Sequence, residues 1–233
     1  MRTLIAGLMA LASMALAGPL LAQANEILVE LFTSQGCSSC PPADALLKKL
    51  DARGGVIALA LHVDYWDYIG WKDSFGDPAY AKRQRAYAYV AGSSTIYTPQ
   101  MIVGGTAIIV GSRPMEVADL IHQMQVRDDG VRMMLERIGN RLHITARMLG
   151  SHSQPMIVQL VRYNPSQSVS ISRGENAGRT IEYVNIVTEW RQIGKWDGKS
   201  PLKLSTRVRG SEPLVVILQA AGPGQVLAAG RLR

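Results

Sequence analysis

The first half of the chain alternates between continuous apolar runs and helically spaced apolar residues. Residues 26–32 and 56–64 are rich in apolar side chains, which is typical of strands that are buried on both faces of a sheet. Between them, apolar residues recur three and four positions apart from Ala43 to Leu50, and Gly54-Gly55 ends this pattern. The pattern predicts a strand, a helix over about 38–53 and a second strand.

A second helix is predicted from Asp77 to about Val90. Asp77 is a favourable N-cap, and Pro78 suits the first helical position, where its missing N–H is not needed. The basic residues of this helix, Arg83 among them, are expected on its solvent-exposed face.

A β-hairpin and a third helix are predicted next. Residues 100–103 and 106–110 are apolar runs joined by Gly104-Gly105, a two-glycine turn of the kind that hairpins favour. The third helix is expected to be capped by Ser112 and to continue to about Val126.

The second half of the chain has no long helical pattern. Short runs with β-forming residues alternate with turn signals such as Asn164-Pro165. Seven strands are expected, at 141–149, 156–163, 168–172, 180–190, 202–208, 214–220 and 225–232. Their spacing predicts a β-sandwich-like domain over 128–233, which follows an α/β domain over 25–127.

Composition indicates a globular, exported protein. Of the 233 residues, 47% are hydrophobic and only 18% are charged, which allows a sizeable core. Residues 1–24 have the features of a secretory signal peptide, with Arg2 at the start, an apolar stretch and Ala22-Gln23-Ala24 as the cleavage site. Cleavage after Ala17 and an uncleaved membrane anchor are the alternatives. In an oxidising compartment the two cysteines would rest as a disulfide unless a partner reduces them.

The net charge of +7 does not by itself indicate a nucleic-acid-binding protein. The basic residues are scattered along the sequence, in runs no longer than pairs such as Lys48-Lys49. No apolar stretch after the leader is long enough to cross a bilayer. We therefore expect a solvated basic surface, no nucleic-acid partner and no stable membrane span after cleavage of the leader.

The only two cysteines, Cys37 and Cys40, form a Cys-Ser-Ser-Cys motif between the first strand and the first helix. A strand–CxxC–helix order is what a thioredoxin-like redox site requires. Pro41-Pro42 must lie in the first helical turn, so the helix begins at about residues 38–41. Cys37 is then expected at the helix edge, where the macrodipole stabilises a thiolate.

A structural disulfide is the simpler interpretation of this motif. A four-residue loop contributes only about 2 kcal/mol by loop entropy, against roughly 4–5 kcal/mol for a long loop. Two cysteines that served stability alone would be better spaced widely. Redox chemistry or metal handling is therefore favoured over a structural role.

Other residues with useful chemistry lie near the predicted strands. Glu30 either reaches solvent at a sheet edge or is buried near the cysteines, where desolvation would keep it partly protonated. His62 and Asp64 share one face at the end of the second strand, as a local hydrogen-bonded pair or as part of a site. The aromatic stretch 65–75 fits packing under a loop better than a substrate groove. Residues 173–176 could line a ligand site, although a polar turn is the preferred interpretation.

The order of elements up to residue 126 resembles the thioredoxin fold. The predicted order is strand, helix, strand, helix, hairpin and helix, with a CxxC motif before the first helix and Pro99 at the start of the third strand. This resemblance implies a cis Thr98–Pro99 bond that faces a Cys37–Cys40 disulfide. It also implies that Glu30 is the buried acid that exchanges a proton with Cys40, provided that one residue is inserted relative to thioredoxins. Thioredoxins have an aromatic residue where this chain has a glycine, directly before the first cysteine.

A narrower resemblance is to DUF1223, a family of exported proteins with a thioredoxin-like fold and unknown function. It is carried by residues 29–44, His62–Trp66 and Tyr97–Gln100, together with Arg173-Gly174-Glu175-Asn176. The resemblance spans most of the mature chain and implies a periplasmic or secreted location in the Gram-negative cell envelope, but it implies no substrate.

These observations predict an exported thiol–disulfide oxidoreductase with an α/β thioredoxin-like domain (βαβαββα) before the β-sandwich-like domain. Cys37 is the expected nucleophile, Cys40 the resolving cysteine and Glu30 the proton carrier, with Thr98 and Pro99 beside the substrate. The expected partners are protein thiols and disulfides and an unidentified envelope protein that resets the pair. No cofactor is expected besides the redox-active disulfide itself.

Two alternatives stay open at the level of sequence. Copper(I) or another metal could bind Cys37 and Cys40, with His62 as a third ligand. Alternatively, the thioredoxin-like half is only a scaffold, and the second half is a non-catalytic interaction module.

Overall fold

The computed structural model describes residues 20–24, 26–127, 130–150 and 154–233, which form a mixed α/β protein. Three helices occur within these ranges: α1 (Pro41–Ala52), α2 (Pro78–Val90) and α3 (Pro114–Gln125). A single 3-10 turn in the same ranges, η1, covers Asp67–Ile69.

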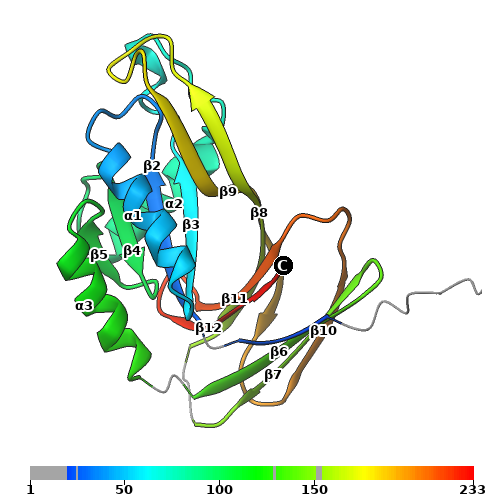
Figure 1. The fold of residues 1–233 in the computed structure, drawn as a ribbon. Helices are drawn as coiled ribbons and strands as arrows, with labels where there is room; N and C mark the ends of the chain where they lie inside the picture. Colours follow the sequence, from blue (N-terminus) through cyan, green and yellow to red (C-terminus); the bar gives the residue numbers. More distant parts are fainter. Residues whose placement is uncertain (1–19, 25, 128–129, 151–153) are drawn as a thin grey trace, which may run out of the picture.

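Two sheets contain the strands of the described residues (Figure 1). The large sheet contains β2 (Ile27–Thr33), β3 (Val56–His62), β4 (Gln100–Val103), β5 (Ala107–Val110), β8 (Met156–Ser170), β9 (Thr180–Trp196), β11 (Leu214–Ala220) and β12 (Val226–Leu232). The small sheet contains β1 (Leu20–Ala24), β6 (Val131–Ile138), β7 (Arg141–Met148) and β10 (Leu202–Arg207).

The large sheet has the strand order β12-β11-β8-β9-β3-β2-β4-β5. Its centre is parallel, because β3 pairs in parallel with both β2 and β9. The other neighbouring strands of this sheet are antiparallel. The hairpin predicted around Gly104-Gly105 is confirmed as the antiparallel pair β4–β5.

Alternation along β2 directs its side chains into two separate cores. Val29 and Leu31 belong to the core that contains residues of α1 and α3, whereas Leu28 and Phe32 belong to the core that contains residues of α2. Figure 1 shows α1 and α3 in front of the sheet and α2 behind it. Because helices cover both faces, every residue of β2 after Ile27 is buried.

The strands of the second half do not have sheets of their own. β8, β9, β11 and β12 extend the large sheet beyond β3. The small sheet packs on this extension through a third core, which includes Leu135, Ile144, Val158 and Val216. Two packed sheets are the arrangement of a sandwich, but here one of them continues into the first half. A continuous sheet therefore crosses the expected domain boundary at 127/128.

The long hairpin of β8 and β9 differs from the predicted strands. β8 runs through Asn164-Pro165 to Ser170, so one strand of 15 residues replaces two predicted ones, and β9 continues to Trp196. An internal proline is tolerated here because Asn164 pairs with Ile186 and the ladder resumes at Ser166, with no pair at Pro165 itself.

One of the two predicted helix caps is confirmed. The Asp77 carboxylate accepts a hydrogen bond from the Ala79 N–H (2.8 Å) at the start of α2. Ser112 does not cap α3, because this helix begins at Pro114 after Arg113 and has no side-chain cap.

Most of the predicted leader, residues 1–24, lies outside the described residues. Its last five residues form β1, which pairs antiparallel with β6 at the edge of the small sheet. In the described part of the chain, no helix is long and apolar enough to cross a membrane.

Candidate functional site

The disulfide lies immediately before α1. Cys40 is the N-cap residue and Pro41 begins the helix, whereas Cys37 lies in the preceding turn and is bonded to Cys40. The helix thus begins within the predicted range of residues 38–41, and Cys37 lies in the turn that leads into it, three residues before the N-cap. Both cysteines are buried, with exposed fractions of 1% for Cys37 and 0% for Cys40.

The loop before β4 lies beside this disulfide. The Thr98–Pro99 peptide bond is cis, as the resemblance to the thioredoxin fold implies. The Ser39 hydroxyl, which lies between the two cysteines, donates to the Thr98 carbonyl (3.5 Å). On the other side, Trp66 Nε1 donates to Thr98 Oγ1 (2.8 Å). Thr98 and Pro99 are thus next to the Cys-Ser-Ser-Cys turn.

The aromatic stretch 65–75 frames the same turn. Trp71 Nε1 donates to the side-chain carbonyl of Gln35 (2.8 Å). A Cβ added to Gly36 would approach the Trp66 Cβ to 3.2 Å, so an aromatic residue cannot replace this glycine without moving Trp66. Tyr68 is 80% exposed and stacks on Trp66, with ring centroids 6.4 Å apart. Trp66 and Tyr68 therefore form a partly exposed aromatic rim beside the disulfide.

The tip of the β8–β9 hairpin, residues 171–179, covers the Cys-Ser-Ser-Cys turn. Asn176 Nδ2 donates to the backbone carbonyls of Cys37 (2.9 Å) and Gln35 (3.0 Å), and Asn176 is itself buried. The Ser38 N–H donates to the Glu175 carboxylate (3.3 Å). Figure 1 shows this tip extending to the end of the sheet where β2 passes into α1. The segment predicted as a polar turn is therefore a turn that closes over the disulfide.

Glu30 is buried, but it does not lie with the cysteines. It is on the α2 face of β2, where Arg83 Nε and Nη2 donate to its two oxygens (2.6 and 2.9 Å). The Tyr87 hydroxyl also donates to Glu30 (2.5 Å). The expected proton exchange between Glu30 and Cys40 is therefore not supported by their positions on opposite faces of the sheet.

Arg83 is not exposed, in contrast to the prediction for α2. Only 13% of its side chain is accessible, and its guanidinium lies 3.9 Å from the centroid of the Trp190 ring. Burial lowers the pKa of Arg83, but the Glu30 carboxylate and the Tyr87 hydroxyl together outweigh burial and raise it above its usual range. Burial, followed by the charge of Glu30, raises the pKa of Tyr87 well above its usual value. Glu30 and Arg83 form a buried ion pair whose other hydrogen bonds are largely satisfied.

A buried acid does lie near the disulfide, and it is Asp44. It follows Cys40 by one helical turn, and its N–H donates to the Cys40 carbonyl (3.1 Å). Neither of its carboxylate oxygens has a hydrogen-bond partner among the described residues. Burial raises its pKa from 3.8 to about 7, although His62 and the nearby Thr33 hydroxyl oppose this shift. The spacing of four residues from Cys40 is the sequence signal that could have identified Asp44.

His62 pairs with Asp73 rather than with Asp64. His62 Nδ1 and Asp73 Oδ2 are 2.8 Å apart, and both side chains are buried. Burial would raise the pKa of Asp73, but His62 and two backbone N–H groups outweigh it and hold the pKa below its usual value. Asp73 is therefore ionised at neutral pH, and Nδ1 of His62 must be the donor. Nε2 of His62 has no partner among the described residues.

The structure does not assemble the alternative metal site. In the described ranges, no group of three or more His, Cys, Asp or Glu side chains is placed to hold a metal ion. His62 is instead enclosed by aromatic rings, with the centroids of Phe75 and Tyr183 at 5.1 and 4.9 Å. Cys37, Cys40 and His62 are thus not a set of ligands in this structure.

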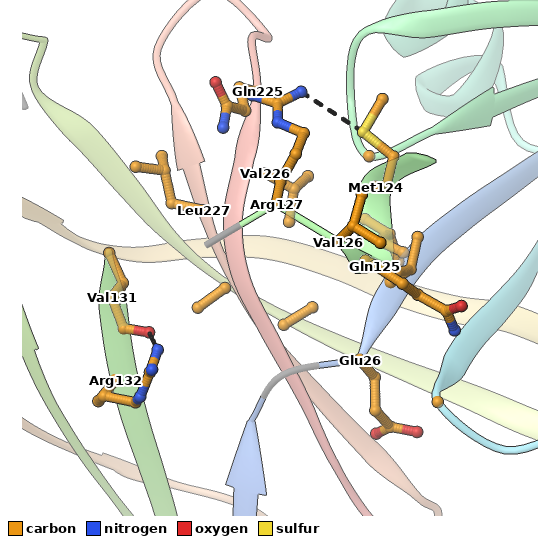
Figure 2. Close-up of a pocket in the computed structure, with 16 residues that line it drawn as sticks. Glu26, Met124, Gln125, Val126, Arg127, Val131, Arg132, Gln225, Val226 and Leu227 are labelled. Carbon is orange, nitrogen blue, oxygen red and sulfur yellow. Dashed lines mark hydrogen bonds between the residues drawn. The ribbon is translucent and has the colours of Figure 1, made fainter. Parts of the chain in front are cut away.

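A separate cavity of about 380 Å³ lies between the end of α3 and β12. Figure 2 shows Arg127 beside Val226, with Met124 and Gln125 on one side of them and Leu227 on the other. Neither cysteine lines this cavity, and no residue of the buried Asp44–His62–Asp73 cluster lines it either. This cavity is therefore separate from the disulfide and from the loop and hairpin tip beside it.

A family model described as "Protein of unknown function (DUF1223)" matches residues 28–219, which is most of the chain. The match includes the disulfide, the Thr98–Pro99 loop and the hairpin tip. No curated protein matches the chain.

Two solved structures are similar to this one. The crystal structure of protein AGR_C_4864 from Agrobacterium tumefaciens has 30% sequence identity and a TM-score of 0.77, over 88% of this chain and 93% of that chain. HBP35 of Porphyromonas gingivalis has 16% identity and a TM-score of 0.59, over 90% of this chain and 75% of that chain. The second likeness concerns the fold alone.

Proposed function

The chain belongs to the DUF1223 family, and we propose that its function is thiol–disulfide exchange at the Cys37–Cys40 pair. The observation that carries this proposal is the position of the disulfide, which joins the N-cap of a helix to the preceding turn and lies beside the cis Thr98–Pro99 loop. A buried, unpartnered acid one helical turn away adds the means to transfer a proton.

The order of elements around the pair supports a thioredoxin-like assignment for residues 26–126. The order β2, α1, β3, α2, β4, β5 and α3 matches βαβαββα, with β4 directly after the cis proline. Placing α1 and α3 on one face and α2 on the other leaves the turn before α1 at the end of the parallel strands, where reactive groups gather in α/β sheets.

In the oxidising direction, two electrons and two protons pass from a substrate dithiol to the protein. A substrate thiolate attacks the Cys37 sulfur, the Cys37–Cys40 bond breaks, and Cys40 leaves as a thiolate. The second substrate thiolate then attacks the substrate sulfur of the mixed disulfide and releases Cys37. The reverse sequence reduces a substrate disulfide, with Cys37 as nucleophile and Cys40 as resolving cysteine.

We propose that Asp44, rather than Glu30, donates a proton to Cys40 when it leaves as a thiolate and accepts that proton in the reverse reaction. A carboxyl group with a pKa of about 7 can both give and accept a proton at neutral pH. Glu30 is unsuited to this role, because Arg83 and Tyr87 already occupy both of its oxygens.

The proposed substrates are protein thiols and disulfides of an envelope compartment, and the pair would be reset by a separate redox protein. The aromatic rim of Trp66 and Tyr68 offers a surface for an extended peptide beside Thr98. Because both cysteines are buried in the closed structure, the hairpin tip must move before such a substrate can reach Cys37.

The proposal is tested by trapping the mixed disulfide. Expressed with its natural leader, the Cys40→Ser variant should accumulate adducts through Cys37 that appear on non-reducing gels and disappear with reductant. The Cys37→Ser variant should trap far fewer adducts. Equal trapping by both variants would indicate incidental thiol reactivity. No trapping by either, together with a wild-type pair that stays oxidised, would favour the scaffold alternative.

A further inference from the structure

The outer face of the small sheet gathers basic residues that are scattered in the sequence. Along β6 and β7 buried and accessible residues alternate, so that Met133 and Leu135 point to the core while Arg132 and Met134 point outwards. The same alternation along β7 and β10 brings further cations to this outer face. Its basic residues are Arg132, Arg141, Arg147, Lys203 and Arg207, and its one described carboxylate is Glu136.

Several of these cations lie opposite each other in the sheet. Arg132 pairs in register with Arg147 across β6 and β7, and Arg141 pairs with Arg207 across β7 and β10. Like charges that lie directly opposite destabilise a sheet. Among the described residues, no carboxylate forms an ion pair with Arg141, Arg147 or Arg207. The repulsion between Arg141 and Arg207 is thus uncompensated within the described part of the protein, which is the arrangement of a surface that meets an anionic partner.

Apolar side chains on the same face distinguish between anionic partners. Met134 and Ile138 are 57% and 55% exposed and lie among the cations. A hollow of about 540 Å³ on this face is lined by Met134, Leu202 and Lys203, among others. The face carries no aromatic residue on which a nucleic-acid base could stack. A second copy of the chain is disfavoured because the same cations would then face each other.

We propose that this face docks the protein on the surface of an anionic lipid bilayer. Cations attract the negative headgroups, and exposed Met and Ile side chains enter the interfacial region. Figure 1 shows the small sheet at the opposite end of the molecule from the tip of the β8–β9 hairpin. A docked molecule therefore directs its Cys37–Cys40 site towards the aqueous compartment.

The test is co-sedimentation of the purified chain with vesicles of phosphatidylcholine alone or of phosphatidylcholine and phosphatidylglycerol in a 3:1 ratio. Binding is expected only to the anionic vesicles and should weaken with increasing salt. The Arg141→Glu/Arg147→Glu variant should lower the partition coefficient at least tenfold. A matched control, Lys49→Glu/Arg53→Glu, reverses two exposed cations on and beside α1 and should lower it no more than about threefold.

Folding of the variants is checked by thermal unfolding. Arg141→Glu alone replaces a repulsive pair by an attractive one with Arg207, so its melting temperature should be equal to or above that of the wild type while binding falls. If Arg141→Glu/Arg147→Glu and the control Lys49→Glu/Arg53→Glu lose binding equally, net charge alone would explain the binding, and the proposal would be overturned. Absence of binding to anionic vesicles, or tighter binding to single-stranded DNA at the same salt concentration, would also overturn it.

Discussion

Two buried carboxylates, Glu30 and Asp44, lie on opposite faces of the large sheet in opposite surroundings. Glu30 accepts three hydrogen bonds from Arg83 and Tyr87, so its charge is compensated. Asp44 accepts none from the described residues, and burial raises its pKa to about 7. Glu30, whose charge is compensated, is therefore assigned a structural role, whereas Asp44 is the carboxylate that we propose for proton transfer.

Replacing Asp44 by asparagine should remove a titration from the exchange reaction. The rate of reduction by dithiothreitol is measured for wild type and for Asp44→Asn from pH 5 to 9. The ratio of the two rates is used because the titration of the reagent affects both equally and cancels. We expect the variant to be slower by about tenfold or more, and the ratio to change around pH 7. Asp119→Asn, at an exposed position of α3, is the control and should leave the profile unchanged. A ratio that is constant with pH would exclude Asp44 as the proton carrier.

The same substitution should stabilise the oxidised protein at neutral and alkaline pH. The folded-state pKa of Asp44, about 7, is above its usual 3.8, so the folded state binds the proton more tightly. The contribution of Asp44 to the free energy of unfolding is therefore greatest below about pH 4, and it is lost as the pH rises to about 7. The loss is on the order of 4 kcal/mol at most. Urea unfolding should show Asp44→Asn above wild type at pH 8 and a vanishing difference near pH 4.

Arg83 should be needed for stability and not for exchange. Arg83→Met leaves Glu30 buried without its cation, which is expected to lower the free energy of unfolding by about 3–5 kcal/mol. Arg85→Met, on the exposed side of the same helix, should change it by less than about 0.5 kcal/mol. Urea unfolding measures both. A large loss of exchange activity in folded Arg83→Met protein would contradict this separation of roles.

At the scale of elements, the sequence predicts helices better than it predicts which polar residues they bury. The ends of α1 and α2 follow from glycines, prolines and Asp77, which act locally. Arg83 was misplaced because a charged residue is usually exposed, yet it lies three residues after Tyr80 and four before Tyr87, on the buried face of α2. Only the position of Glu30 across the interface explains its burial, and this contact spans 53 residues of sequence.

The hairpin tip is the element whose role was least visible in the sequence. A turn at residues 173–176 is predictable from its polar residues, but its contact with Cys37 depends on the length of β8 and β9. Pro165 favoured a break between two short strands, and a hairpin interrupted at that point would not extend as far as Cys37. The sequence therefore indicated the two cysteines and Pro99 as parts of the candidate site, but it did not indicate that the hairpin tip covers them.

Opening of this tip should control access to the disulfide. Asn176→Ala removes the two hydrogen bonds that join the tip to the disulfide turn, each worth about 1 kcal/mol, and should increase the open population by about thirtyfold. Reduction by a protein dithiol such as reduced thioredoxin should accelerate accordingly, and reduction by dithiothreitol should accelerate less. Asn164→Ala removes a side-chain bond to Gln167 lower in the same hairpin and is the matched control. Equal rates in wild type and Asn176→Ala would show that the tip does not limit access.

At the scale of the whole molecule, the two halves share one sheet. β9 pairs with β3 at Ala60 and Ile186, and Asn185, which has a positive φ of 49°, donates from Nδ2 to the Ala58 carbonyl (2.8 Å). The core on the α2 face contains Phe32 from the first half and Ile217 from the second. Local patterns along a sequence do not specify which distant strand lies beside β3, and so the sharing could not be predicted.

This sharing predicts that the two halves unfold together. The four tryptophans divide evenly, with Trp66 and Trp71 in the first half and Trp190 and Trp196 in the second. Urea unfolding followed by fluorescence should give coincident midpoints in Trp66→Phe/Trp71→Phe and in Trp190→Phe/Trp196→Phe, each compared with its own circular dichroism transition. A fragment of residues 25–127 should not fold alone, because it would expose the β3 edge and lose seven of the 17 buried residues of the shared core. Two separate transitions, or a folded fragment, would instead establish two autonomous domains.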